Sequence, residues 1–223
     1  MSLAVVRSRA TFGIEAPLVE IEVHLSKGLP GLSIVGLPET AVKESRHRVR
    51  SAILNSGFEF PVRRITVNLA PADLPKEGGR YDLPIALGIL AASGQIPFQS
   101  LMNYEVVGEL ALTGELRPCR GLLPIAIASQ KTGRSLLTAK LPSEEIFFIN
   151  GLSLYTAGNL IDVCSHLSGA QQLPVESPMQ PLPENSLEGL DLSQVQGQPH
   201  ARRALEIAAA GGHSLLMVGP PGS

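Results

Sequence analysis

Residues 17–28 read PLVEIEVHLSKG and alternate strictly between apolar and polar side chains. One side of an extended strand here would carry Val19, Ile21, Val23 and Leu25. The other side would carry Glu20, Glu22 and His24. A period of two residues is typical of an antiparallel strand with one face in the core and one in water. The stretch therefore predicts an antiparallel sheet that is covered on one side.

Strand-like and helix-like segments follow one another along the first three quarters of the chain. Further strands are predicted over 2–9, 31–37, 63–70, 134–139 and 152–157. Residues 104–118 predict either one strand or a strand pair with its turn at 113–115. Helices are predicted over about 38–57, 82–94, 121–133 and 158–169. Asp82 is expected to cap the second helix, worth about 1 kcal/mol. This mixture predicts an α+β (mixed α/β) domain of about 170 residues.

Composition narrows the class of protein. Apolar residues make up 44% of the chain, but aromatic residues only 4%, so the core must be aliphatic. Residues 1–140 hold 16 Lys and Arg against 12 Asp and Glu (+4), and residues 141–223 hold 2 against 8 (−6). Cys119 and Cys164 fit neither a disulfide framework nor a zinc motif. With no signal-like start and no long apolar run, we expect a cytoplasmic protein without membrane contact and without a metal site in this chain.

The composition changes after residue 170. Residues 171–190 contain four prolines and no regular apolar period, which indicates a linker. Beyond it we expect a helix over about 199–210 and a strand over 214–218. The closing letters GPPGS match the first half of the phosphate-binding pattern GxxxxGK[ST], with Gly219 as the first glycine and Pro220, Pro221, Gly222 and Ser223 as the spacer.

Three stretches together carry a family resemblance. They are GLPETAVKESRHRVRSAILNSGFEFPVRRITVNLAPADLPKEGGRYDLPIALGIL, VVGELALTGELRPCRGLLPIA and VQGQPHARRALEIAAAGGHSLLMVGPPGS. With them, essentially the whole chain resembles the N-terminal part of the bacterial YifB/ComM family, whose members are often labelled magnesium-chelatase-like or competence proteins. The resemblance implies a domain like the Lon proteolytic domain (ribosomal S5 domain 2-like fold) over 1–170, a linker over 171–190 and the truncated start of an AAA+ ATPase domain over 191–223.

The resemblance also implies what the chain lacks. A Lon-like peptidase needs a serine activated by a lysine. The serine position falls on Asp82, or on Tyr81 or Arg80 if the gap is placed differently, and the lysine position falls on Leu123. We therefore expect no peptidase activity. The pattern at 219–223 includes neither the lysine nor the Mg²⁺ ligand of a P-loop, so ATP and Mg²⁺ are expected to act in the full-length parent and not in this chain.

A basic helix supplies the remaining candidate site. Lys43, Arg46, Arg48 and Arg50 could contact DNA phosphates, or could form a solvated helix face. No aromatic residue on the helix offers base stacking, so binding would be non-specific and salt-dependent. The resemblance implies a hexameric, ATP-driven DNA motor, a branch-migration helicase in natural transformation. The alternative is a chelatase motor subunit, which the Lon-like front domain argues against.

Overall fold

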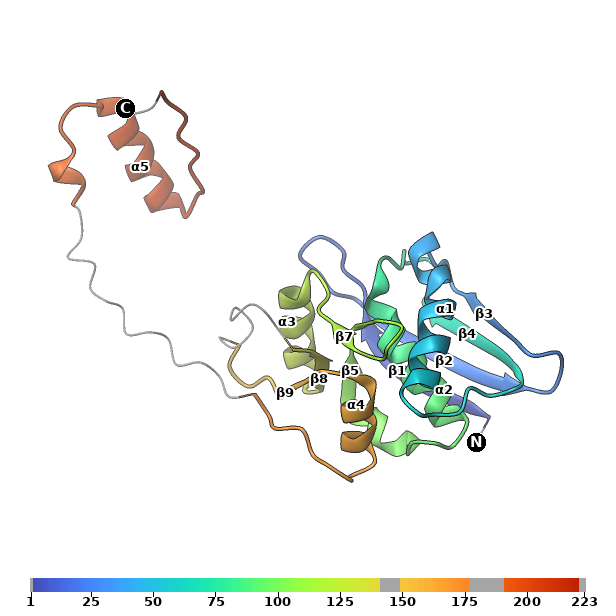
Figure 1. Cartoon of the computed structure of the whole chain (residues 1–223). Coiled ribbons are helices and arrows are strands. Elements are labelled where there is room, and N and C mark those ends of the chain that lie inside the picture. The colour runs from blue at the N-terminus through green and yellow to red at the C-terminus, as the bar shows by residue number, and fades with distance from the viewer. Residues whose placement is uncertain (1, 141–148, 177–190, 221–223) are drawn as a thin grey trace. The chain divides into compact units, whose positions relative to one another are not determined.

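The computed structural model describes residues 2–140, 149–176 and 191–220. Figure 1 shows the chain, which divides into two compact units, residues 1–180 and 181–223. Each unit is treated by itself below. In the described residues, no helix has both the length and the apolar character that crossing a bilayer requires.

A seven-stranded sheet forms the centre of the first unit. The strands in spatial order are β3 (Gly31–Val35), β4 (Arg64–Ala70), β2 (Leu18–Ser26), β1 (Leu3–Arg9), β5 (Tyr104–Val106), β8 (Ser135–Ala139) and β9 (Leu154–Ala157). β2 pairs antiparallel with both β1 and β4, as the alternating sequence predicts. The other neighbours run parallel. The predicted mixed α/β class is therefore confirmed.

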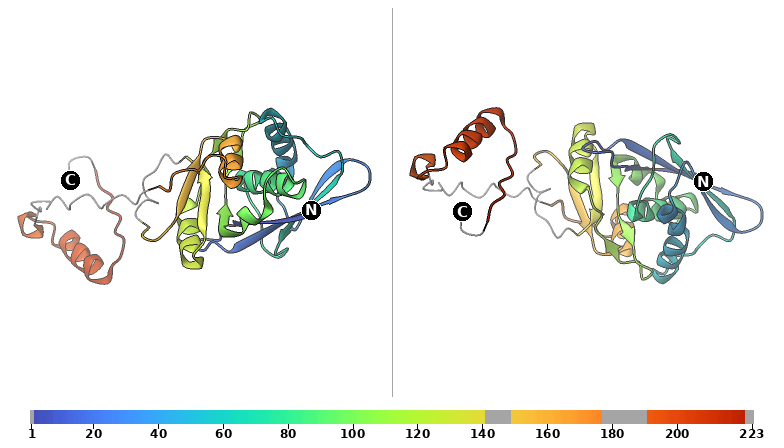
Figure 2. Two further views of the ribbon diagram at one scale, coloured as in Figure 1. Left: turned by 90° about the horizontal axis from the view of Figure 1, so that it is seen from below. Right: turned by 90° about the horizontal axis from the view of Figure 1, so that it is seen from above.

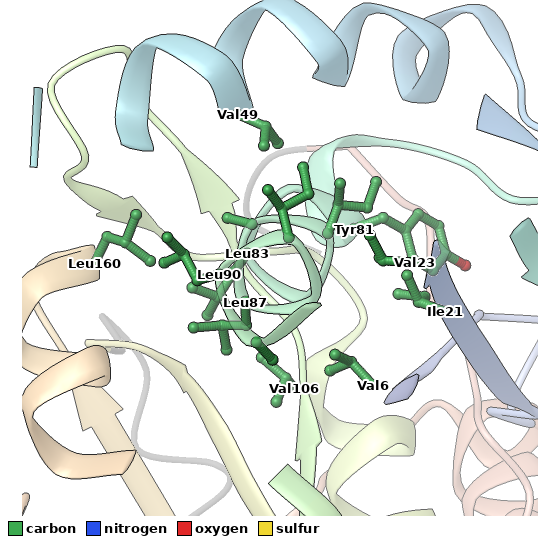
Figure 3. Packing of buried hydrophobic residues seen from close by; sticks show 14 of the residues in the cluster. Val6, Ile21, Val23, Val49, Tyr81, Leu83, Leu87, Leu90, Val106 and Leu160 are labelled. Atoms are coloured by element: carbon green, nitrogen blue, oxygen red, sulfur yellow. The ribbon is translucent and has the colours of Figure 1, made fainter. Parts of the chain in front are cut away.

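The alternation in β2 arises because only one of its faces meets the core. Val19, Ile21 and Val23 are fully buried, and Leu25 is nearly so. Helix α2 (Asp82–Ala92) covers this face, and every one of its residues is buried. Figure 3 shows α2 enclosed by Val49 of α1 (Thr40–Asn55), Leu160 of α4 (Leu160–Leu167) and strand residues such as Val6. Gly88 allows the close approach, since a Cβ there would lie 2.5 Å from Cγ2 of Val23.

Helix α3 (Leu122–Thr132) covers the opposite face of the sheet (Figure 2). Two adjacent residues of β8 show that the two faces of the sheet belong to different hydrophobic clusters. Leu137 packs in the cluster that contains α2, whereas Leu136 packs with Ile125 and Ala126 of α3. Side chains that alternate along a strand point to opposite faces. The first unit is thus a sheet between two helical layers.

A short hairpin and single turns complete the first unit. The hairpin pairs β6 (Glu109–Leu110) with β7 (Leu116–Arg117), so the strand pair predicted over 104–118 is found. Two 3₁₀ turns, η1 (Gly79–Tyr81) and η2 (Phe98–Asn103), precede α2 and β5.

The predicted linker starts too early in the sequence. Leu173 packs against the core of the first unit, and the hydroxyl of Thr156 donates to Glu176 over 2.5 Å. Residues 171–176 therefore belong to the first unit, because their side chains find partners there. Residues 177–190 lie outside the described residues.

The second unit contains η4 (Leu192–Gln194) and α5 (Pro199–Gly211). The helix predicted over 199–210 is confirmed. The strand predicted over 214–218 is wrong, since these described residues are extended but pair with no strand. A strand needs a neighbour for its backbone hydrogen bonds, and the described part of this unit supplies none.

Candidate functional site

Asp82 lies at the start of α2 and is completely buried. Nε of Arg48 donates to its Oδ2 over 2.6 Å, and Nη2 of Arg48 donates to Oδ1 over 3.1 Å. The hydroxyl of Ser45 also donates to Oδ1, and the amide of Leu110 donates to Oδ2 over 3.3 Å. The carboxylate thus joins α1, α2 and the β6–β7 hairpin.

The predicted capping role of Asp82 is wrong. The cap position of α2 is Tyr81, and no side chain caps the helix. Asp82 turns instead toward α1, where a guanidinium can balance its buried charge. The hydrogen bond from Arg48 to Asp82 is in turn the main reason why the pKa of Arg48 is raised, against the opposing effect of burial.

This arrangement bears on the two positions, Asp82 and Leu123, at which the resemblance to Lon would place a serine and a lysine. The carboxylate at the nucleophile position is occupied by four donor contacts, so it has no free lone pair aimed at a substrate. Leu123 at the lysine position is the second residue of α3 and is 38% exposed. Its hydrocarbon side chain cannot accept a proton.

Lys76, the only lysine in the preceding loop, also does not face open space. It is fully buried, and its ammonium group donates to the carbonyl of Pro71. Burial lowers the pKa of Lys76. The contact fixes the loop 71–76 and leaves the ammonium group turned toward backbone.

A small hollow lies beside this region. Its volume is about 350 Å³, and its walls include Glu77, Arg80, Glu109 and Arg120. Arg80 donates through Nε to the carbonyl of Glu77 over 3.3 Å, while its Nη1 is buried and has no hydrogen-bond partner among the described residues. Nη1 of Arg117 lies 3.9 Å from Oε1 of Glu109. Two arginines and two glutamates leave the hollow close to neutral.

The four cations predicted to contact DNA have different surroundings in the structure. Arg48 is held by Asp82 and is not a free cation. Lys43, Arg46 and Arg50 are exposed along another side of α1, and Arg50 lies over the ring of Phe60 at 4.8 Å from its centroid. Phosphate contact by these three residues stays a prediction.

The three exposed cations face the edge of the sheet across a groove. Two hollows of about 580 Å³ and 470 Å³ lie side by side between α1 and β3, and they share Leu32, Arg46 and His47. The groove was not foreseen from the sequence, because its two walls are separate elements with no shared motif. We call it the β3–α1 groove.

The first unit also contains a buried ion pair on its α3 side. Arg9 of β1 donates to Glu105 of β5 through Nε over 2.5 Å and through Nη2 over 2.9 Å. Ser129 and Arg134 add hydrogen bonds of 2.5 Å and 3.1 Å to the same carboxylate. Burial alone would raise the pKa of Glu105, but the hydrogen bonds from Arg9 and Ser129 outweigh it and lower the pKa. Opposite charges inside two apolar strands were the sequence signal for this pair.

Comparison with known families places the chain. A family model described as subunit ChlI of Mg-chelatase matches residues 21–141, more than half of the sequence. The chain belongs to the ChlI family. A second model, described as magnesium chelatase, subunit ChlI, matches residues 191–223.

Relatives agree with this assignment and confirm the resemblance to YifB and ComM. The ChlI-family chain is 53% identical to the competence protein ComM of Haemophilus influenzae and 54% identical to YifB of Escherichia coli, in both cases over its whole length. It is 38% identical to an uncharacterized protein of Mycobacterium bovis. In each case it covers 44% of the relative, so it spans less than half of their length.

The two ChlI matches fall on different candidate sites. The match over 21–141 contains both Asp82 and the β3–α1 groove. The match over 191–223 contains the partial phosphate-binding pattern, of which Gly219 and Pro220 are described and residues 221–223 lie outside the described residues. The described residues just ahead of this pattern, 214–218, form no strand.

Proposed function

We propose that this chain is a non-catalytic binding module of an AAA+ ATPase of the ComM/YifB type. In the longer protein, the module would support a hexameric, ATP-driven motor that moves branched DNA. ATP and Mg²⁺ would act in that longer protein, which we place in the cytoplasm. The unpaired Cys119 and Cys164 are compatible with a reducing compartment.

One observation carries the non-catalytic part of this proposal. The position expected for a nucleophilic serine holds Asp82, whose buried carboxylate is neutralised by Arg48 and accepts a hydrogen bond from Ser45. A nucleophile needs an unshared electron pair that a substrate can reach. The electron pairs of Asp82 are buried and face these donors, which supports a role of the first unit in binding and not in cleavage. The motor part of the proposal depends on the whole-chain identity with ComM and YifB.

The test compares the full-length protein with this chain. We expect the full-length protein to hydrolyse ATP faster when forked or four-way DNA is added, and to move the branch point only with hydrolysable ATP. The 223-residue chain should hydrolyse neither ATP nor a fluorogenic peptide. A full-length protein whose ATPase ignores every DNA structure would contradict the proposed motor.

A chelatase motor subunit is the second candidate function. Both family models carry the name of the chelatase subunit ChlI, including the one that matches the front region. The front domain therefore does not argue against this function, contrary to our expectation from the sequence. Insertion of Mg²⁺ into a porphyrin by the full-length protein with chelatase partner subunits, together with no response to DNA, would favour this candidate.

A further inference from the structure

Strand β3 is an open edge of the sheet. It pairs with β4 in parallel, and the amide of Gly31 donates to the carbonyl of Arg63 over 3.3 Å. In a parallel pair, every second residue of a strand directs its backbone N–H and C=O groups to the neighbouring strand. The residues between them direct these groups to the opposite side. Leu32 and Ile34 therefore direct their N–H and C=O groups outward, where no described residue pairs with them.

Exposed apolar side chains flank both ends of this edge. Edge strands are normally shielded by charges, bulges or covering segments, because free backbone groups invite another strand. Leu29 is 90% exposed and Val62 is 82% exposed, and Leu37 lies beyond the other end of the strand at 57%. An exposed apolar patch beside free backbone groups indicates a surface that binds another chain.

The second wall of the β3–α1 groove is cationic. Lys43, Arg46, His47 and Arg50 line it, and Glu44 is the only acidic residue among its lining. Apolar surface from Leu32, Ile34, Phe60 and Val62 lies between the cations and the edge. An occupant of this groove must supply backbone hydrogen bonds, apolar side chains and negative charge together.

These requirements favour a peptide over a nucleic acid. Phe60 is the only aromatic residue lining the groove apart from His47, and the guanidinium of Arg50 already covers one face of its ring, so the groove offers little aromatic surface for stacked bases. A strand, in contrast, matches the spacing of the free groups at Leu32 and Ile34, and its alternate side chains reach the apolar surface.

We propose that the β3–α1 groove binds an extended, acidic segment of a partner protein, which adds to the sheet as a further strand beside β3. Backbone pairing to Leu32 and Ile34 supplies the alignment. Lys43, Arg46 and Arg50 select acidic side chains. This inference does not depend on the ATPase, so its failure would leave the proposed motor function untouched.

The test measures fluorescence anisotropy of a labelled peptide of about eight residues in which Glu alternates with Val. We expect saturable binding to the 223-residue chain at low salt. The double substitution Lys43→Glu and Arg46→Glu should weaken binding at least about tenfold. Lys131→Glu on α3 is the matched control, because this exposed residue lies on the opposite face of the sheet, and it should leave binding within about twofold.

Backbone pairing is tested in the peptide, which avoids disturbing the protein. Two peptides carry N-methyl groups on alternate amides, one on the even positions and one on the odd. Only one set of amides can face β3, so one peptide should lose binding and the other should keep it. The proposal is overturned if both methylated peptides bind alike, if no peptide binds, or if a single-stranded oligonucleotide of equal charge binds more tightly to the same cations.

Discussion

Nε of Arg48 lies 2.6 Å from Oδ2 of the fully buried Asp82. This contact joins a residue predicted to meet DNA with one predicted to cap a helix. Each therefore has a structural role that its own local sequence did not indicate. The contact also explains why one member of the basic helix turns inward while its neighbours remain in solvent.

Replacing Arg48 with Ala should destabilise the first unit. The change would leave the buried carboxylate of Asp82 without its cation, and breaking such a pair costs about 2–4 kcal/mol when one partner is partly exposed. The midpoint of urea unfolding, followed by circular dichroism, would measure the loss. Arg46→Ala is the matched control on the same helix and should change stability by less than about 0.5 kcal/mol. Equal effects of the two substitutions would show that the ion pair has no special role.

Glu105→Gln should destabilise the α3 side of the same unit. Gln keeps the shape but not the charge, so Arg9, which is 5% exposed, loses its bidentate partner. We expect a loss of about 3 kcal/mol in the free energy of unfolding. Because the folded-state pKa of Glu105 is lowered, its contribution is complete above about pH 4.5 and is lost as the pH falls through the folded-state pKa. The wild-type chain should therefore lose more stability than the variant on acidification, and parallel pH profiles would contradict this account.

His166 should make the segment that follows α4 sensitive to mild acid. Its Nδ1 accepts a hydrogen bond from the amide of Leu173 over 3.1 Å, and its Nε2 lies 2.9 Å from the hydroxyl of Tyr104. Burial lowers its pKa, so the neutral ring is favoured in the folded state. The unfolded state binds more protons just below pH 6.5, and stability should fall as the pH drops below that value.

Amide exchange offers a direct measurement of this effect. Protonation of Nδ1 removes the acceptor of the Leu173 amide. Exchange of that amide, corrected for the intrinsic pH dependence, should therefore become faster as the pH falls from about 7.5 to about 5.5, one unit on either side of the ordinary histidine pKa. The amide of Gly94 serves as the reference. It donates to the carbonyl of Ala91 over 3.1 Å and is far from any histidine in the sequence. An unchanged ratio between the two amides would refute the role of His166.

Both cysteines should resist alkylation in the folded protein. Burial raises the pKa of Cys119 to about 11 and that of Cys164 to about 12. The thiolate is the reactive form, so at pH 8 Cys119 should react with iodoacetamide about a hundredfold more slowly than a free thiol. Mass spectrometry of timed samples would give the rates, with urea-unfolded protein as the control. Rapid labelling of folded protein at either residue would contradict the burial.

Gly36 should tolerate no side chain. Its φ is +95°, and a Cβ there would lie 2.2 Å from the carbonyl oxygen of Leu69. Because the obstacle is backbone of the neighbouring strand β4, it cannot swing aside as a flexible side chain could. Gly36→Ala should cost about 3 kcal/mol, measured by thermal or urea unfolding. Gly57→Ala, also at positive φ but with open space around the Cβ position, is the control and should cost less.

Local sequence patterns predicted the elements of the first unit well. The alternation over 17–28 is found in β2, and the helix predicted over about 38–57 is found as α1. These patterns succeed because burial on one face leaves a period that a single segment displays. The prediction of a strand over 214–218 is wrong because it used a short apolar run alone. Such a run forms a strand only when a partner strand is present.

The site was harder to predict because it depends on contacts between distant segments. Asp82 meets Arg48 across 34 positions, and Arg9 meets Glu105 across 96. Spacing in the sequence does not encode such pairs. A charged residue within an otherwise apolar segment is the only local sign, and it does not say which opposite charge will pair with it. The β3–α1 groove could not be predicted for the same reason, because the strand and the helix form its two walls only after the chain folds.

The buried contact of Asp82 with Arg48 also has an evolutionary consequence. Replacing Asp82 with a serine would leave the guanidinium of Arg48 and the hydroxyl of Ser45 beside a smaller, uncharged side chain. A serine could therefore enter this position without a loss of stability only if Arg48 changed as well, because the two residues are coupled. The ion pair thus restricts which residues evolution can place at the start of α2.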